Sequence, residues 1–406
     1  MLLSFKQKYI YPLIVSDKEL VQACRTGNLP LLRNYINEHN VNGIDKDGTH
    51  IPLVLACWEN QVDVVKFLLT FPNLDINKIG KDLNPTTASH ISLLSLGPVM
   101  PALFASICVA KSKDKNKSDV AVEIIQLLVS DDRTKFEYEY NLHNNSSLGL
   151  ACNLDLYYVV KLLLPYTDPN TAKYNNEQVI IHAYNRRNYH IVELILSSPK
   201  FDLASNYNYY AGKYFADIVV DDCNYDLLQV MISQPHIDIN GFHFRGTMGS
   251  KPSESFLHQA CIKGLTKMVD MCFSRHDLDV NLVDDMDRQA IYYATNHSSV
   301  LCMLLSRPDL QVRNPHECIV RAVDRRNYIT LLLLIADDRF SLVEDISYMV
   351  PWERESHINK LVTAFWTNPE ATRQNAKQQL KLSYPTLYSS FPSSSPPIRP
   401  STLINN

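Results

Sequence analysis

The sequence lacks a large excess of charge of either sign. Its 406 residues carry a formal net charge of -4, and charged residues make up 20% of the chain. Such a chain has no global attraction to nucleic acid or to an anionic membrane, so these contacts would need a local patch. The hydrophobic content of 46% is ordinary for a folded soluble protein. We therefore expect a folded chain without a nucleic-acid partner.

The sequence also lacks the short motifs of common catalytic and metal sites. It contains no H-E-x-x-H, no G-x-S-x-G and no cysteine or histidine spacing of a zinc site. The glycines near residue 246 resemble a phosphate-binding loop only superficially, because Thr247 stands where the P-loop pattern requires lysine. We expect no enzymatic activity, cofactor, metal or small-molecule substrate.

Its cysteines contain no C-x-x-C pair. Cys24, Cys57, Cys152 and Cys261 each directly follow an alanine at the same place in a recurring phrase. A cysteine at a fixed place in a repeating unit is most simply a small buried apolar residue. Free thiols are typical of a reducing compartment, so the expected location is the cytoplasm.

Two apolar stretches are tested for membrane or export signals. Lys6 and Lys8 interrupt the N-terminal stretch, so residues 1–16 are interpreted as a cap segment of the folded protein. Residues 91–110 carry no charge and are followed by lysines, as at the end of a membrane-spanning helix. Pro98 and Pro101 interrupt this stretch, and therefore we do not expect a membrane contact.

A helical pattern recurs along most of the chain. It is counted from an anchor position, occupied in the seven clearest frames by Ala23, Ala56, Ala151, Ala183, Val219, Ala260 and Ala322. The residues eight, nine, twelve and thirteen positions after each anchor are apolar, with Thr330 as the exception. This spacing places the side chains on one face of an α-helix. Each frame therefore predicts an amphipathic helix at a fixed offset.

Turn signals follow this helix at fixed offsets. Proline recurs sixteen positions after the anchor, and a short β-prone run ends on asparagine at Asn77, Asn240 and Asn281. Proline after an apolar helix ends it, and asparagine suits a turn. The predicted unit is a helix, a turn, a second helix and an extended finger.

The repeat resembles the ankyrin repeat. Successive anchors are spaced by 33, 32, 36 and 41 residues, and a period near 33 is typical of that family. Altered forms of its T-P-L-H-x-A opening stand at 50–57 (HIPLVLAC), 100–106 (MPALFAS) and 255–261 (SFLHQAC). The resemblance implies an all-α repeat solenoid of stacked helix-turn-helix units with short β-hairpin-like fingers. It also implies a local hydrogen bond for His258.

The frames divide the chain into four parts. About nine frames, two of them weak, cover residues 17–345, with insertions near 111–117 and 241–255 that we interpret as exposed loops. Residues 346–382 are expected to form a C-terminal helical cap. Residues 383–406 are rich in serine and proline and are expected to be a disordered tail.

The resemblance implies that partners dock on the fingers and first helices. The candidate contacts are Arg25, Trp58, Asn185 and Ile262 two positions after an anchor, Asp45, Lys46 and Asp47 at a fingertip, and Tyr207, Tyr209 and Tyr210 along another finger. Trp58 and Ile262 would be binding hot spots if exposed, although Trp58 could equally pack on a neighbouring repeat. The tyrosines could serve recognition or finger packing.

The function implied is a non-enzymatic scaffold or adaptor that binds a partner protein of unknown identity. One alternative is an effector of an intracellular microbe or virus, acting on host proteins in the host cytosol. Another is a membrane-attached adaptor anchored through residues 91–110. Both alternatives rest on analogy or on one uncharged stretch.

One phrase, Arg-Arg-Asn-Tyr, occurs twice, at 186–189 and at 325–328. Arg187 and Arg326 stand four positions after their anchors, where other frames have glycine, asparagine or aspartate. Those residues tolerate a left-handed turn conformation better than arginine does. We therefore expect a modified turn between paired helices rather than a basic docking motif.

Overall fold

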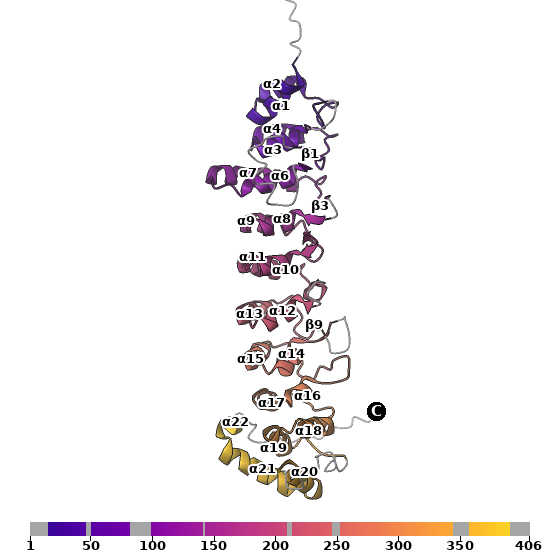
Figure 1. Ribbon diagram of the computed structural model, residues 1–406, viewed down its shortest axis with the longest axis vertical. Coiled ribbons are helices and arrows are strands. Elements are labelled where there is room, and N and C mark those ends of the chain that lie inside the picture. The colour runs from indigo at the N-terminus through magenta and orange to yellow at the C-terminus, as the bar shows by residue number, and fades with distance from the viewer. Residues whose placement is uncertain are drawn as a thin grey trace, which may run out of the picture. The chain divides into compact units, whose positions relative to one another are not determined.

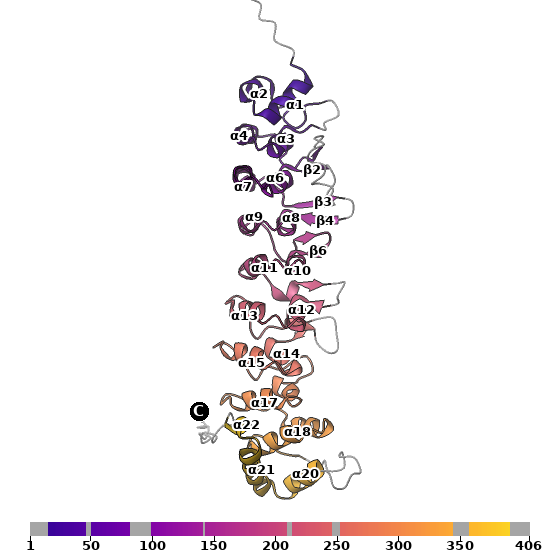
Figure 2. The same cartoon turned by 60° about the vertical axis from the view of Figure 1, so that its left-hand side comes forward.

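The computed structural model is mostly helical and divides into two compact units, Met1–Phe201 and Asp202–Asn406. Figures 1 and 2 show its helices and hairpins from two sides. The described residues are 15–45, 50–81, 99–140, 143–208, 213–245, 252–343 and 357–389.

The first unit consists of paired helices joined by β-hairpins. The pairs are α1 (Asp17–Thr26) with α2 (Leu29–Tyr35), α3 (Pro52–Trp58) with α4 (Val62–Leu69), α6 (Ala102–Ala110) with α7 (Lys115–Val129), α8 (Ser147–Asn153) with α9 (Tyr157–Leu163), and α10 (Val179–Asn185) with α11 (Tyr189–Leu196). The antiparallel strand pairs are β1 (Gly80–Lys81) with β2 (Val99–Met100), β3 (Glu137–Tyr140) with β4 (His143–Ser146), and β5 (Lys173–Tyr174) with β6 (Glu177–Gln178).

The second unit continues the same alternation. Its pairs are α12 (Phe215–Asp221) with α13 (Tyr225–Ser233), α14 (Phe256–Lys263) with α15 (Thr266–Phe273), α16 (Ala290–Ala294) with α17 (Ser298–Leu305), and α18 (Pro315–Asp324) with α19 (Tyr328–Ala336). A 3-10 turn (Leu203–Ser205) and the strand pair β7 (Tyr207–Asn208) with β8 (Lys213–Tyr214) precede α12. Between α13 and α14, β9 (Phe244–Arg245) pairs with β10 (Pro252–Glu254). The chain then forms α20 (His357–Thr367), α21 (Pro369–Ser383) and α22 (Pro385–Ser389).

Within each unit, helices of the same rank pack on one another. In the first unit α3, α6, α8 and α10 follow α1, while α4, α7, α9 and α11 follow α2. The predicted helix faces form the core between them: Ile191, Val192, Ile195 and Leu196 are all buried. Thr330, the polar exception to the pattern, is buried as well, and its hydroxyl has no hydrogen-bond partner within the described ranges.

The four cysteines that follow an anchor are buried, as predicted. Burial raises the pKa of the Cys24 and Cys57 thiols to about 12, because a buried thiolate loses its hydration. All nine cysteines are free. The four thiols that follow an anchor therefore serve as small core residues.

The turn between paired helices has one geometry in seven places. A residue with a positive φ stands four positions after the anchor, namely Gly27, Asn60, Asp155, Arg187, Cys223, Gly264 and Arg326. The next amide donates to the anchor carbonyl, as from Asn188 to Ala183 at 3.0 Å and from Asn327 to Ala322 at 3.0 Å. This bond satisfies a carbonyl that the helix end leaves free. The modified turn predicted at Arg187 and Arg326 is confirmed.

Asparagine side chains connect successive hairpin segments. Asn77 donates from Nδ2 to the Arg133 carbonyl at 2.7 Å and accepts at Oδ1 from the Lys135 amide at 2.7 Å. Asn42, Asn240 and Asn281 make the same two bonds to the segments that follow them. We call these four residues the asparagine bridges. Asn77, Asn240 and Asn281 were predicted to form turns. Their side chains also connect one repeat of the pattern to the next.

Arginine side chains connect the same neighbours in the opposite direction. Arg133 binds Asp131 (2.7 Å) and donates from Nη1 to the Phe71 carbonyl at 2.9 Å, near the end of α4. Arg275 and Arg339 do the same with Asp277 and Asp337 and with the ends of α13 and α17. We call Arg133, Arg275 and Arg339 the capping arginines. They donate to carbonyls at or just after the helix ends, where intrahelical partners are missing.

The insertion predicted at 111–117 is not simply a loop. Only residues 111–114 separate α6 from α7, and residues 115–117 already belong to α7. The Asp114 side chain accepts from the amides of Asn116 and Lys117, which caps the new helix start. The extra residues therefore lengthen α7. Of the insertion at 241–255, residues 246–251 lie outside the described residues, while the flanks form β9 and β10.

The C-terminal cap is helical where it is described. α20 and α21 pack on α19, and Arg373 of α21 donates to the Ile335 carbonyl at 2.9 Å. The tail was expected to be disordered from residue 383. This start is wrong, because α21 includes Ser383 and α22 follows, packed on α21. Residues 344–356 and 390–406 lie outside the described residues.

Among the described residues, no helix has the length and apolar character needed to cross a bilayer. Residues 99–100 and 102–110 of the uncharged stretch form β2 and α6, and α6 begins directly after Pro101. Residues 91–98 and 1–14 fall in the ranges that are not described.

Candidate functional site

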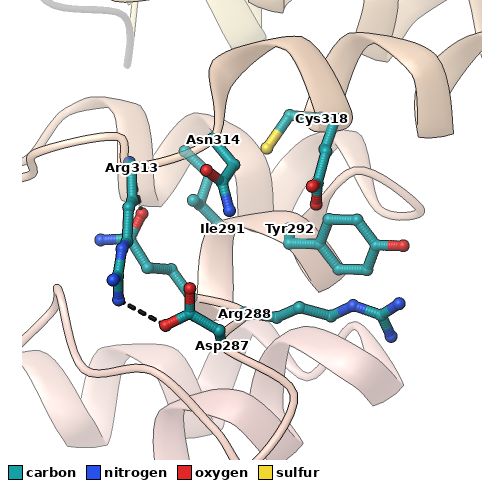
Figure 3. Close-up of a pocket in the computed structure, with 9 residues that line it drawn as sticks. Asp287, Arg288, Ile291, Tyr292, Arg313, Asn314 and Cys318 are labelled. Carbon is teal, nitrogen blue, oxygen red and sulfur yellow. Dashed lines mark hydrogen bonds and ion pairs between the residues drawn. The ribbon is translucent and has the colours of Figure 1, made fainter.

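A narrow cleft lies on the hairpin side of the second unit, between the turn at 284–288, α16 and α18 (Figure 3). It is lined by Asp287, Arg288, Gln289, Ile291, Tyr292, Arg313, Asn314, Glu317 and Cys318. Its volume of about 10 Å³ is close to that of a single water-sized sphere. The cleft therefore fits the tip of a side chain and not a metabolite.

Buried polar groups fix the turn that carries Arg288. Asp284 accepts at Oδ1 from the amides of Met286 (2.9 Å) and Arg288 (3.0 Å). Its other oxygen accepts a short hydrogen bond from the Tyr293 hydroxyl. Burial, together with this bond to Asp284, raises the pKa of Tyr293, so this hydroxyl stays protonated. The Arg288 backbone is thus held in one position.

His258 supports the same turn from α14. Its Nδ1 lies 2.8 Å from the Ser255 hydroxyl, and its Nε2 lies 3.1 Å from the Arg288 carbonyl. Burial lowers the pKa of His258, because the charged ring would lose hydration. The local hydrogen bond expected for this histidine is confirmed. The second bond, to Arg288, was not predicted.

Two guanidinium groups contact the ring of Tyr292. The Cζ atom of Arg288 lies 4.6 Å from the ring centroid, and that of Arg321, on α18, lies 4.5 Å from it. Arg321 also donates from Nη1 to the Tyr292 hydroxyl at 3.1 Å. Such cation–π contacts orient both guanidinium groups against one aromatic ring. We call Arg288, Tyr292 and Arg321 the arginine–tyrosine cluster.

A third arginine at the cleft is paired with a carboxylate. Arg313 forms an ion pair with Asp287, as Figure 3 shows. Elsewhere on the first helices, Asp221 binds Lys213 (2.5 Å) and Lys263 (2.7 Å). Asp221 stands two positions after an anchor, where partner contacts were expected. Its negative charge is balanced there by the two lysines.

Two of the predicted contacts are less exposed than a hot spot would be. Trp58 and Ile262 are both half-buried rather than exposed. The Trp58 Nε1 is buried and has no hydrogen-bond partner in the described part of the chain. Both side chains are thus covered in part, and their role as binding hot spots stays a prediction. The opposing interpretation of Trp58, packing within the array, accounts for its burial better.

The remaining predicted contacts are distributed over both units. Arg25 is half-buried, and its carbonyl accepts from Gln61 Nε2 at 2.8 Å. Asn185 is exposed and donates to Glu177 Oε1 at 2.8 Å. Asp45 accepts from His50, which closes the fingertip.

Some of the predicted contacts have no described side chain. Tyr207 pairs through its backbone with Tyr214 in the β7–β8 hairpin. Lys46, Asp47, Tyr209 and Tyr210 lie outside the described residues.

A second, larger cleft lies on the second-helix side of the first unit. It measures about 1000 Å³ and lies between α7 and α9, where the start of α7 extends past its neighbours (Figure 1). Tyr158 at its edge is 78% exposed and contacts Tyr157 edge-on. Two of its acidic residues are paired, Glu123 with Lys66 and Asp155 with His190. The sequence did not predict this cleft, because residues 115–117 were interpreted as a loop.

No family model matches the chain. One similar protein is osteoclast-stimulating factor 1 of Bos taurus, with 40% identity over 63 residues. The match covers 15% of this chain and 29% of that protein, so the chain spans less than a third of the length of this relative. Among the described residues, no group of three or more histidine, cysteine, aspartate or glutamate side chains could hold a metal ion.

Proposed function

We propose that the chain is a non-enzymatic scaffold that binds a partner protein through the hairpins and first helices of an ankyrin-like repeat solenoid. The observation that carries this proposal is the recurrence of one turn, with a positive φ four positions after the anchor, in seven places. The asparagine bridges and capping arginines support it, because they join several neighbouring repeats of the pattern. Stacked units of this kind share one continuous core.

Several chemically reactive side chains have structural roles, which favours binding over catalysis. His258 holds the turn at Arg288, and Cys24, Cys57, Cys152 and Cys261 are buried in the core. Because the thiols are free, we include a cytoplasmic location in the proposal. The partial similarity to osteoclast-stimulating factor 1 is compatible with the proposal and does not identify a partner.

The test is affinity capture from cell lysate with two matched pairs of substitutions. Asn185→Arg with Asp324→Arg changes exposed positions on first helices, and Gln126→Arg with Asp270→Arg makes the same charge change on second helices. We expect specific partners to be lost with the first pair and retained with the second. Loss only with the second pair, or no effect of either pair on folded protein, contradicts the proposed surface.

Trp58 is tested separately because it is half-buried. If it contributes to binding, Trp58→Ala lowers partner recovery, while Trp58→Phe retains most of the apolar contact. Thermal unfolding of both variants separates a binding effect from a loss of stability. Partner recovery that stays intact while stability falls would exclude Trp58 from the interface.

A further inference from the structure

Five arginines of the second unit are paired with a carboxylate. The pairs are Arg275 with Asp277, Arg307 with Asp309, Arg313 with Asp287, Arg339 with Asp337, and Arg373 with Asp338. Three of these pairs join residues two positions apart and have N–O distances of 2.6 to 2.7 Å. The chain thus tends to neutralise its arginines locally.

Arg288 and Arg321 depart from this habit. Within the described ranges, neither forms an ion pair with a carboxylate. Both instead contact the Tyr292 ring, at 4.6 and 4.5 Å. Asp284 attracts Arg288 without forming an ion pair with it. Two cations on one ring also repel each other, and an anion bound beside them relieves this repulsion.

The Arg288 guanidinium is engaged in part, because it donates from Nη1 to the Met286 sulfur at 3.4 Å and also donates to the Tyr293 hydroxyl. A guanidinium has five N–H donors, so Arg288 keeps others for a ligand. Stacking on a ring uses the faces of a guanidinium and leaves its N–H edges available. Arg321 uses Nη1 for the Tyr292 hydroxyl, while its Nε is buried and has no partner among the described residues. Such a planar fork of donors is suited to a carboxylate, which it can bind through two parallel hydrogen bonds.

None of the nearby acidic side chains that the structure describes forms an ion pair with Arg288 or Arg321. Asp284 accepts from Tyr293 and from two backbone amides, and Asp287 binds Arg313. Glu317 lines the cleft one turn before Arg321 on α18 and forms no ion pair with any described residue.

We propose that the arginine–tyrosine cluster binds a carboxylate side chain on an acidic segment of the partner protein. The proposal rests on the proposed function, since the cluster lies on the hairpin and first-helix side assigned to partners. The small cleft beside Tyr292 is suited to the tip of one side chain. Recognition would then combine a charge-assisted hydrogen bond with an aromatic contact.

The test uses two labelled peptides, one alternating glutamate with glycine and one alternating glutamine with glycine. Fluorescence anisotropy with the full chain should show binding of the glutamate peptide only, and added salt should weaken it. Arg288→Gln and Arg321→Gln should each lower the affinity by about tenfold or more, because a hydrogen bond to a charged group is lost. Arg325→Gln is the matched control, as it removes the same charge from an exposed position at the end of α18.

The conservative variant Arg321→Lys guards against misfolding, because it keeps the charge and loses the planar fork. We expect it to lose most of the binding while its thermal unfolding stays close to that of the unmodified chain. The inference is overturned if the unmodified chain does not bind the glutamate peptide, or if Arg325→Gln weakens binding as much as the cluster variants do.

Affinity capture separates this inference from the scaffold proposal. If Arg288→Gln and Arg321→Gln recover the same partners as the unmodified chain, the acidic-ligand site is wrong and the scaffold proposal stands. If the chain recovers no specific partner but its peptide binding depends on the two arginines, the scaffold proposal fails and the site remains.

Discussion

In the first unit the extra residues of the pattern lengthen α7, whereas in the second unit the irregular positions lie on the hairpin side, around Glu254 and Arg288. Both units share the turn with positive φ, the asparagine bridges and the capping arginines. The cleft beside α7 is large, and two of its acidic residues are paired, while the cleft beside Tyr292 is small and adjoins two unpaired guanidinium groups. In these two clefts, therefore, a larger volume does not come with more unpaired charge.

The capping arginines should contribute equally to both units. Arg133→Ala and Arg275→Ala each remove several hydrogen bonds to backbone carbonyls, among them those to Leu69 and Ile232 at the ends of α4 and α13. We expect each change to lower the free energy of unfolding by about 2–4 kcal/mol. Urea unfolding provides the measurement. Arg313→Ala is the control and should cost about 1 kcal/mol or less, since its ion pair is exposed.

Glu254 should make the second unit sensitive to pH. Its side chain is 2% exposed and accepts from Gln259 at 2.7 Å, and burial raises its pKa to about 7. The folded state therefore holds the proton more tightly than the unfolded state, so stability is highest below the unfolded pKa. It falls as the pH rises towards 7, by about 2–3 kcal/mol in total.

The variant Glu254→Gln tests this assignment, because it stays neutral at every pH. Thermal unfolding from pH 5 to pH 8 should show a smaller decline for this variant than for the unmodified chain. Glu193→Gln, at an exposed position of α11, is the matched control. An equal decline for Glu254→Gln and the unmodified chain would count against a buried ionisable group at this position.

Substitution at the glycine turns should lower stability, in contrast to substitution at the arginine turns. A Cβ atom at Gly264 would lie 2.5 Å from His297 Nδ1, and its φ of 71° disfavours any other residue. Gly264→Ala should therefore cost about 1–3 kcal/mol. Gly27→Ala is its counterpart in the first unit, where the added atom would meet the Gln61 side chain. Unchanged stability of both variants would show that the close approach is relieved without cost.

The smallest expected effect is a gain of stability at the arginine turns. Arg187 and Arg326 have φ values of 61° and 53°, which arginine adopts at a cost. Arg187→Gly and Arg326→Gly should each stabilise the chain by about 0.5–1 kcal/mol, measured by urea unfolding. The neighbouring Arg186→Gly is the control, because Arg186 has a φ of -84° and should lose stability instead. A loss in all three variants would mean that the arginine side chains make stabilising contacts.

The sequence predicted the features that depend on local spacing. The apolar face, the buried cysteines and the turn at Arg187 all follow from residues within one frame, because they reflect helix periodicity and the capping of a helix end. The start of α7 was not predicted, since lysine-rich residues are compatible with both a loop and a helix. Asp114, which caps the helix, decides between them. The helical structure beyond Ser383 was not predicted either, because it depends on packing against neighbouring helices.

The candidate site depends on contacts between distant frames, so the sequence could not predict it. Arg321 lies 29 positions after Tyr292, and the His258 contact to Arg288 spans 30 positions. Each partner is an ordinary residue within its own frame. The partial burial of Trp58 could not be predicted for the same reason. Its place two positions after the anchor predicts which way the side chain points, but not which residues of other frames cover it. One signal was available, namely that Arg288 and Arg321 lack the aspartate two positions away that accompanies Arg275 and Arg307.

The asparagine bridges have a consequence for how such a chain can change over many generations. Asn42, Asn77, Asn240 and Asn281 bond to the backbone of the following segment and not to its side chains. Every residue offers the same carbonyl, and every residue except proline offers the same amide. A duplicated or exchanged segment would therefore meet its neighbour with the correct partners already in place, and the outer positions could diverge without weakening the junction.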